Sequence, residues 1–160
     1  MAELTTVGVY ESDLQTFLGV LERAGVKLVI DVRQRRGVRG PQYAWANSAR
    51  LQDSLSAAGI DYAHHKELAP TTELRQLQYT EDEKQGVGKR SRRRLAPEYV
   101  RRYTEEVLDA VDLAEIVREL PAQGAAALLC VERDPEACHR SLIARRMADE
   151  YGVAVSHLRP

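Results

Sequence analysis

The alternation of apolar strand segments with amphipathic helix segments constrains the fold of this chain more than any other feature of its sequence. Residues 26–32 (VKLVIDV) form a nearly continuous apolar run, as expected for a strand that is covered on both faces. Residues 4–10 are rich in β-branched side chains and residues 60–64 follow a second helical pattern, so both are predicted strands. Strands and helices in this order favour a parallel sheet with right-handed crossovers.

Helical patterns separate these strands. Ser12 and Gln15 match a capping box, and the apolar residues after it recur at helical spacing until Gly25. Asn47 or Ser48 can cap a second helix that leads into the strand at residues 60–64. The first half of the chain is therefore predicted to be strand, helix, strand, helix, strand.

A polar interruption follows at residues 66–96, which we predict to be a basic excursion from the core with room for one short helix. Pro97 suits the first turn of a helix that runs to near Pro121. Residues 125–132 read as the next strand.

The remaining elements complete a single domain. Asp134-Pro135-Glu136 predicts the start of a helix that ends at Gly152, and residues 153–158 are a last strand. A chain of 160 residues with 44% hydrophobic and 29% charged residues suits one globular core. We predict one α/β domain over residues 1–160, with a mainly parallel sheet flanked by helices in a Rossmann-like, three-layer arrangement.

Polar and reactive side chains gather where the predicted strands end. In an open parallel sheet, ligands bind outside the carboxyl ends of the strands. These ends deliver Tyr10, Glu11, Asp31, Arg33, His64, His65, Cys130 and Glu132. The next helix begins with Cys138-His139-Arg140, where free backbone N–H groups favour an anion. A phosphate or a carboxylate is therefore the expected ligand.

Two long stretches carry a resemblance to a known family. They are TVGVYESDLQTFLGVLERAGVKLVIDVRQRRGVRGPQY and LLCVERDPEACHRSLIARRM, with GIDYAHHKEL between them. Their combination of Gly8, Tyr10, Asp31-Val-Arg33 and Cys130-x-Glu132-x-Asp134-Pro135-x-x-Cys138-His139-Arg140 closely resembles the bacterial domain-of-unknown-function 488 family. The resemblance implies a compact α/β fold that carries this motif cluster, and it supplies no established reaction.

The chain departs from that family pattern in two places. Arg36 and Val38 stand where the pattern has Pro and Ser, and residues 66–69 are Lys-Glu-Leu-Ala in place of Pro-x-Leu-Gly. Both departures flank the segments that deliver the candidate site.

Arginine is the expected anion-binding residue type, because its planar fork of donors suits a phosphate. Residues 33–50 hold five arginines and no acid. The candidate anion-binding residues are Arg33, Arg39, Arg140, Tyr10, His64 and His65. For Asp31 and Arg33, an ion pair at the strand end is the structural alternative.

The candidate catalytic residues are Cys138, His139, Glu132 and Asp31. A cysteine near a helix N-terminus and beside His139 and Arg140 is expected to have a lowered pKa, although a small buried apolar role remains open. Cys130 lies inside an apolar strand and is interpreted as buried. Rhodanese- or cysteine-phosphatase-like thiol chemistry is kept only as an analogy, because ten positions separate Cys130 from Arg140.

The sequence leaves the cofactor open. Cys130, Cys138, His139 and His64 or His65 are candidate zinc ligands, but Cys-x₇-Cys-His lacks the short spacing of structural zinc sites, so zinc is not predicted. A magnesium ion on Asp31, Glu132 and substrate phosphates fits better, without a diagnostic motif.

The net charge of −1 hides an uneven distribution. Residues 84–103 hold eight cations and one acid, whereas residues 105–119 hold six acids and one cation. The alternative function is therefore a non-catalytic nucleic-acid-binding module that uses Arg90, Arg92, Arg93 and Arg94 together with the arginine-rich loop at residues 33–39. Neutralisation of the two segments within the fold or across a homodimer is equally open.

Cysteine content and the N-terminal sequence indicate the compartment. Two cysteines are too few for a disulfide framework, and Met-Ala-Glu-Leu-Thr-Thr lacks the regions of a signal peptide. We expect a reduced, cytoplasmic protein without a membrane segment, because the apolar runs are far shorter than a membrane span.

Overall fold

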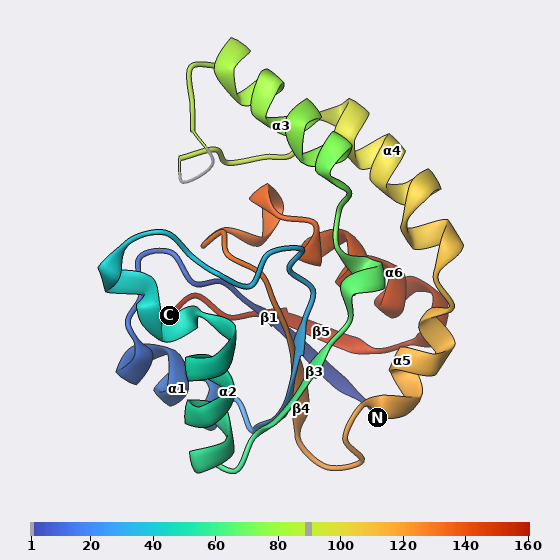
Figure 1. The fold of residues 1–160 in the computed structure, drawn as a ribbon. Coiled ribbons are helices and arrows are strands. Elements are labelled where there is room, and N and C mark those ends of the chain that lie inside the picture. Colours follow the sequence, from blue (N-terminus) through green and yellow to red (C-terminus); the bar gives the residue numbers. More distant parts are fainter. Residues whose placement is uncertain (1, 89–90) are drawn as a thin grey trace.

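The computed structural model describes residues 2–88 and 91–160 and contains one parallel sheet (Figure 1). Its strands are β1 (Glu3–Val7), β2 (Val26–Asp31), β3 (Asp61–His64), β4 (Ala125–Leu129) and β5 (Ala154–His157). All four strand pairs are parallel, in the order β3-β2-β4-β1-β5. Because β4 lies between β1 and β2, the order differs from the 3-2-1-4-5 order of dinucleotide-binding folds.

Helices cover both faces of this sheet (Figure 1). The α-helices are α1 (Leu14–Arg23), α2 (Ser48–Ala57), α3 (Thr72–Lys84), α4 (Pro97–Glu106), α5 (Leu113–Glu119) and α6 (Arg140–Tyr151), and all but α3 pack on a face of the sheet. One core cluster joins α1 and α2 to the sheet, and a second joins α4, α5 and α6 to the opposite face. The predicted three-layer α/β fold is confirmed.

Strand β2 shows why its sequence is apolar throughout. Val29 packs with α1 and α2, whereas the next residue, Ile30, packs in the cluster on the other face. Both side chains are fully buried. Successive side chains of a strand point to opposite faces, so a strand between two helical layers has no solvent-facing position.

Several predicted helix ends differ from the structure. Asp13, and not Ser12, caps α1, because its Oδ1 accepts a hydrogen bond of 2.8 Å from the Thr16 N–H. The helix predicted from Pro97 is two helices, because Asp112 caps a new helix at α5 by accepting from the Ala114 N–H.

The helix predicted from Asp134 also starts later. A short 3₁₀ turn spans Pro135–Ala137, Cys138 has extended backbone, and α6 begins at Arg140. Cys138 and His139 therefore precede the helix and are not part of its first turn.

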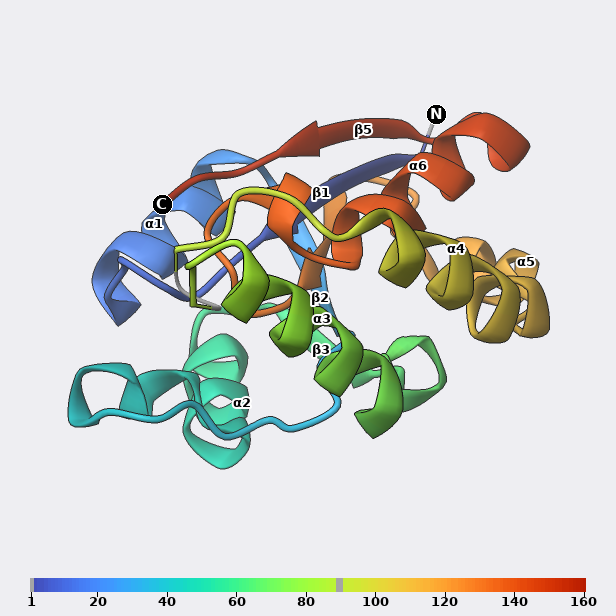
Figure 2. The ribbon, with the colours of Figure 1, turned by 90° about the horizontal axis from the view of Figure 1, so that it is seen from above.

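The polar segment at residues 66–96 holds α3, which is longer than the short helix expected there. Thr71 caps α3 by accepting from the Leu74 N–H, and Leu74 is fully buried. Gln78 of α3 accepts a hydrogen bond of 2.9 Å from the Ala96 N–H, next to the start of α4. Figure 2 shows α3 lying across the end of the sheet, so the segment forms a roof over the predicted site.

A glycine allows the floor beneath this roof to form. A Cβ on Gly8 would lie 1.9 Å from the Glu132 carbonyl oxygen, so only glycine lets the end of β1 pass this close to the loop after β4. The Val131 carbonyl accepts hydrogen bonds from the N–H groups of Val9 and Tyr10. These contacts fix the direction in which Cys130 and Glu132 leave the sheet.

Candidate functional site

A cavity of about 550 Å³ lies between the carboxyl end of the sheet and α3. Residues 33–39 and 75–83 contribute to its walls. Its floor includes Cys130, Glu132, Cys138 and His139, which come from the end of β4 and the chain before α6. The fold therefore brings three of the four predicted catalytic residues, Glu132, Cys138 and His139, to one cavity.

The two cysteines and His139 form a compact buried cluster. The Nδ1 atom of His139 is 3.7 Å from the Sγ atoms of both Cys130 and Cys138. The Nδ1 and two Sγ atoms lie within 4.8 Å of one another. The Nε2 atom is 2.9 Å from the Val32 carbonyl oxygen, which can only accept a hydrogen bond. Nε2 therefore carries a proton, and Nδ1 faces the two sulfurs.

The two thiols differ in their acidity. Burial raises the pKa of Cys138, but the hydrogen bond from Cys130 and the positive charges of His139 and Arg140 outweigh it and hold that pKa well below its usual range. The hydrogen bond to Cys138, followed by burial, raises the pKa of Cys130. Burial opposes protonation of His139, but the negative Cys138 raises the pKa of the imidazole.

Glu132 lies beside this cluster. Its Oε2 atom is 3.7 Å from the Cys130 Sγ atom, and its Oε1 atom accepts a hydrogen bond of 2.6 Å from Arg92. Burial raises the pKa of Glu132 to about 7, with Cys138 adding to the rise and Arg92 opposing it.

Asp31 and Arg33 form a buried ion pair. Arg33 donates to the two carboxylate oxygens of Asp31 at 2.9 and 2.8 Å, and to the Ala46 carbonyl at 2.8 Å. Tyr62 donates a further hydrogen bond to Asp31. The structure thus has the ion pair that was the alternative for these residues. Of the pair considered for magnesium, Glu132 lines the cavity and Asp31 does not.

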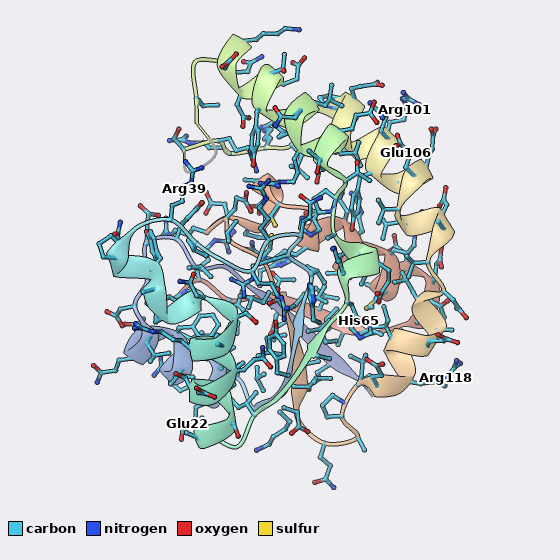
Figure 3. The ribbon with its side chains drawn as sticks, viewed as in Figure 1. Glu22, Arg39, His65, Arg101, Glu106 and Arg118 are labelled. Carbon is cyan, nitrogen blue, oxygen red and sulfur yellow. The ribbon has the colours of Figure 1, made fainter. Side chains whose placement is uncertain are left out.

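Three other predicted residues also lie outside the cavity lining. Arg140 is fully buried and donates to the carbonyl oxygens of Glu132 and Arg133, which positions the loop after β4. His64 contacts the Arg33 carbonyl through Nε2 at 3.0 Å. His65 binds two carboxylates beside α5 (Figure 3). Tyr10 and Arg39 do line the cavity.

The arginines predicted to bind nucleic acid differ in their exposure to solvent. The Arg92 side chain is 8% exposed and donates to Asp82, Glu132 and the Ala137 carbonyl. It lines the cavity, so it does not face a nucleic acid on the outside of the protein. Arg93 and Arg94 are exposed. Arg90 lies outside the described residues.

Sequence reasoning missed Arg75 on α3. Its guanidinium donates to the Gln34 side-chain oxygen at 2.6 Å and to the Tyr79 hydroxyl at 3.0 Å. Both partners are neutral, and no carboxylate of residues 2–88 and 91–160 pairs with this half-buried arginine in the cavity wall. The only signal for α3 was Thr71 followed by Leu74 and Leu77 at helical spacing.

His65 gives a pH-dependent contact between β3 and α5. Its Nδ1 atom contacts Glu67, and its Nε2 atom is 2.8 Å from Glu119. Burial lowers the pKa of His65, but the two carboxylates outweigh burial and raise it above 6.5. A histidine whose pKa is higher in the folded than in the unfolded state adds to the free energy of unfolding. This contribution is complete at pH values below the unfolded pKa, and it is lost as the pH rises through the folded pKa.

We therefore expect the stability advantage of the wild type over His65→Gln to be largest near pH 5.5 and to fall by up to about 1 kcal/mol towards pH 8.5. Urea unfolding of both proteins across this range measures the difference. A difference that is constant with pH would show that the charged histidine contributes nothing.

Comparison with known proteins identifies a family without adding an activity. None of the helices in the described part of the chain is long and apolar enough to cross a bilayer. No curated protein and no solved structure matches the chain. The family described as "Domain of unknown function DUF488" matches residues 13–147, which is most of the sequence. The chain therefore belongs to the DUF488 family.

Proposed function

We propose that the cavity is an enzyme active site that binds a phosphate-bearing small molecule, with the Cys130–Cys138–His139 cluster and Glu132 as its reaction centre. The observation that carries this proposal is Arg75, a half-buried cation in the cavity wall whose partners among the described residues are neutral. Desolvated charges in proteins are paired, so a cation placed in this way favours an anionic ligand.

The other lining charges support an anion. Five arginines and three acids line the cavity: Arg33, Arg35, Arg39, Arg75, Arg92, Asp82, Glu83 and Glu132. Asp82 and Glu132 are already paired with Arg92. Within the described part of the chain, Arg35 has no hydrogen bond or ion pair. The cavity therefore has positive charge that is available to bind an anionic ligand.

The shape of the cavity favours a small molecule. Its volume of about 550 Å³ falls inside the range of about 300–1,000 Å³ that holds small ligands and cofactors. The arginines lie along its walls, and the sulfur and imidazole groups lie at its floor. A phosphate held by the walls would bring an attached reactive group towards the floor.

The Arg75→Met variant tests this proposal with inorganic pyrophosphate and adenosine monophosphate as probes. Loss of a charge-assisted contact of about 1.5–3 kcal/mol corresponds to a Kd that is roughly 10- to 100-fold higher. Isothermal titration calorimetry measures the change. Arg101→Met is the matched control, because Arg101 lies on the exposed side of α4 and pairs with Glu98 and Glu105 (Figure 3).

Nucleic-acid binding remains the second candidate because Arg93 and Arg94 are exposed. A duplex oligonucleotide titrated at several salt concentrations distinguishes the two functions, since each neutralised phosphate steepens the salt dependence by a slope of about 0.9. Tight, salt-dependent duplex binding that Arg75→Met leaves unchanged, without binding of either small probe, would overturn the small-molecule proposal.

A further inference from the structure

We propose that Cys130, Cys138 and His139 form a binding site for a zinc-type divalent cation, with a fourth coordination position that opens into the cavity. This inference concerns the floor of the cavity and does not depend on whether the walls bind phosphate.

The spacing of the donor atoms fits a tetrahedral ion. Zinc–sulfur bonds of about 2.3 Å and zinc–nitrogen bonds of about 2.0–2.1 Å place neighbouring sulfur and nitrogen ligands roughly 3.6 Å apart. The Nδ1 atom of His139 is 3.7 Å from each of the two sulfurs. The nitrogen therefore already lies at about the tetrahedral separation from each sulfur, and the two sulfurs lie within 4.8 Å of each other.

The imidazole ring is held as a ligand. Its Nε2–H donates to the Val32 carbonyl at 2.9 Å, which directs Nδ1 at the two sulfurs, and a bound cation would take the place of any proton on Nδ1. Metal-binding histidines almost always donate their other N–H to a carboxylate, a carbonyl or water, which fixes the tautomer and the ring orientation. His139 has this support from Val32, the residue that follows β2, which lies far in the sequence from all three ligands.

The backbone explains why the sequence spacing concealed the site. Seven residues separate Cys130 from Cys138, and they form a loop with a 3₁₀ turn in place of a short metal-binding knuckle. Arg140 is fully buried and holds the carbonyl oxygens of Glu132 and Arg133 from inside this loop. The loop is therefore closed by hydrogen bonds, and its two ends bring the cysteines together.

The fourth position makes this a reactive site. All three ligands line the cavity, and zinc sites with three protein ligands keep the fourth position for water or substrate. Glu132 lies beside the cluster, with Oε2 3.7 Å from the Cys130 sulfur. Two thiolates and an imidazole favour a zinc-type ion over magnesium, which prefers oxygen ligands. A bound ion would polarise an oxygen of the molecule held in the cavity.

Cobalt and zinc binding test the site. Chelator-treated wild-type protein is expected to bind one equivalent of Co²⁺ with a thiolate-to-cobalt charge-transfer band and the intense visible bands of a tetrahedral ion, and Zn²⁺ should displace it. Removal of one supporting hydrogen bond weakens metal binding by about 10- to 100-fold, so the loss of a ligand in Cys138→Ser or His139→Gln is expected to exceed about 100-fold. His157→Gln is the matched control, because His157 lies on β5 outside the cavity lining and contacts Thr6.

Alkylation of the cysteines in the wild-type protein tests the metal site without any variant, so it still decides the question if a variant fails to fold. Zn²⁺ should protect both cysteines from iodoacetamide, and a chelator should restore their reaction. A wild type that binds Co²⁺ without the thiolate band, or whose thiols alkylate equally with and without Zn²⁺, would overturn the proposal. Arg75→Met should retain zinc binding, so a failure of phosphate binding is distinguishable from a failure of the metal site.

Discussion

The Asp31→Asn variant is expected to lose about 3–5 kcal/mol of its free energy of unfolding, because it leaves a buried charge without its partner. The Arg33 side chain is 2% exposed and directs two of its donor groups at the Asp31 carboxylate. An amide of the same shape cannot supply the negative charge. Urea unfolding monitored by circular dichroism measures the loss.

Two further variants show whether the unpaired charge is the cause. Asp31→Asn combined with Arg33→Met removes both charges and should regain part of the loss, since apolar replacement of a buried pair is often close to neutral. Arg118→Met removes one partner of an exposed pair with Glu115 and should change stability by less than about 1 kcal/mol. A loss for Asp31→Asn as small as that of Arg118→Met would contradict this interpretation.

The Arg92→Met variant is expected to have an effect of similar size, about 3–5 kcal/mol, for the opposite reason. It leaves Asp82 and Glu132 buried without their counter-charge, with side chains that are 6% and 9% exposed. Because Asp82 is on α3 and Glu132 is on the floor, Arg92 also joins the roof of the cavity to its base.

Hydrogen exchange separates these two consequences. Amides of α3 should exchange faster in Arg92→Met than in the wild type, beyond the increase expected from the lower global stability, because the roof loses its attachment. Arg101→Met, on the exposed side of α4, should leave α3 exchange unchanged. Wild-type exchange rates throughout α3 in Arg92→Met would show that the roof is held by other contacts.

The layers of the fold were predictable because their sequence signals are strong. The apolar run of β2 and the helix that ends at Gly152 each have a local physical cause, burial on both faces in one case and a left-handed C-cap in the other. The position of β4 between β1 and β2 was not predictable, since strand order depends on contacts between segments far apart in the sequence.

Helix α3 was underestimated because polar contacts anchor much of its buried side. Leu74 is its one fully buried apolar residue, and Gln78 and Asp82 are buried through hydrogen bonds to Ala96 and Arg92. A helix that is anchored by polar contacts has a weak hydrophobic pattern, so periodicity alone reads it as a polar loop.

The sequence predicted that the end of one strand and the start of the next helix lie together. Glu132 from the first and Cys138 and His139 from the second do line one cavity, and their roles stay a prediction. The sequence could not decide whether an arginine faces a ligand or an acceptor within the protein. Arg33 donates to the Asp31 carboxylate and Arg140 donates to backbone carbonyls, whereas Arg75, which was not predicted, lies in the cavity wall. Cys130 is buried, as predicted, and it also lines the cavity.

The most direct measurement of phosphate binding is a crystal structure of the protein soaked with tungstate, an oxyanion that gives a strong anomalous signal. We expect an anomalous peak inside the cavity, within hydrogen-bond distance of the Arg75 guanidinium. An empty cavity, with peaks only beside exposed residues such as Arg93 and Arg94, would contradict the proposed active site.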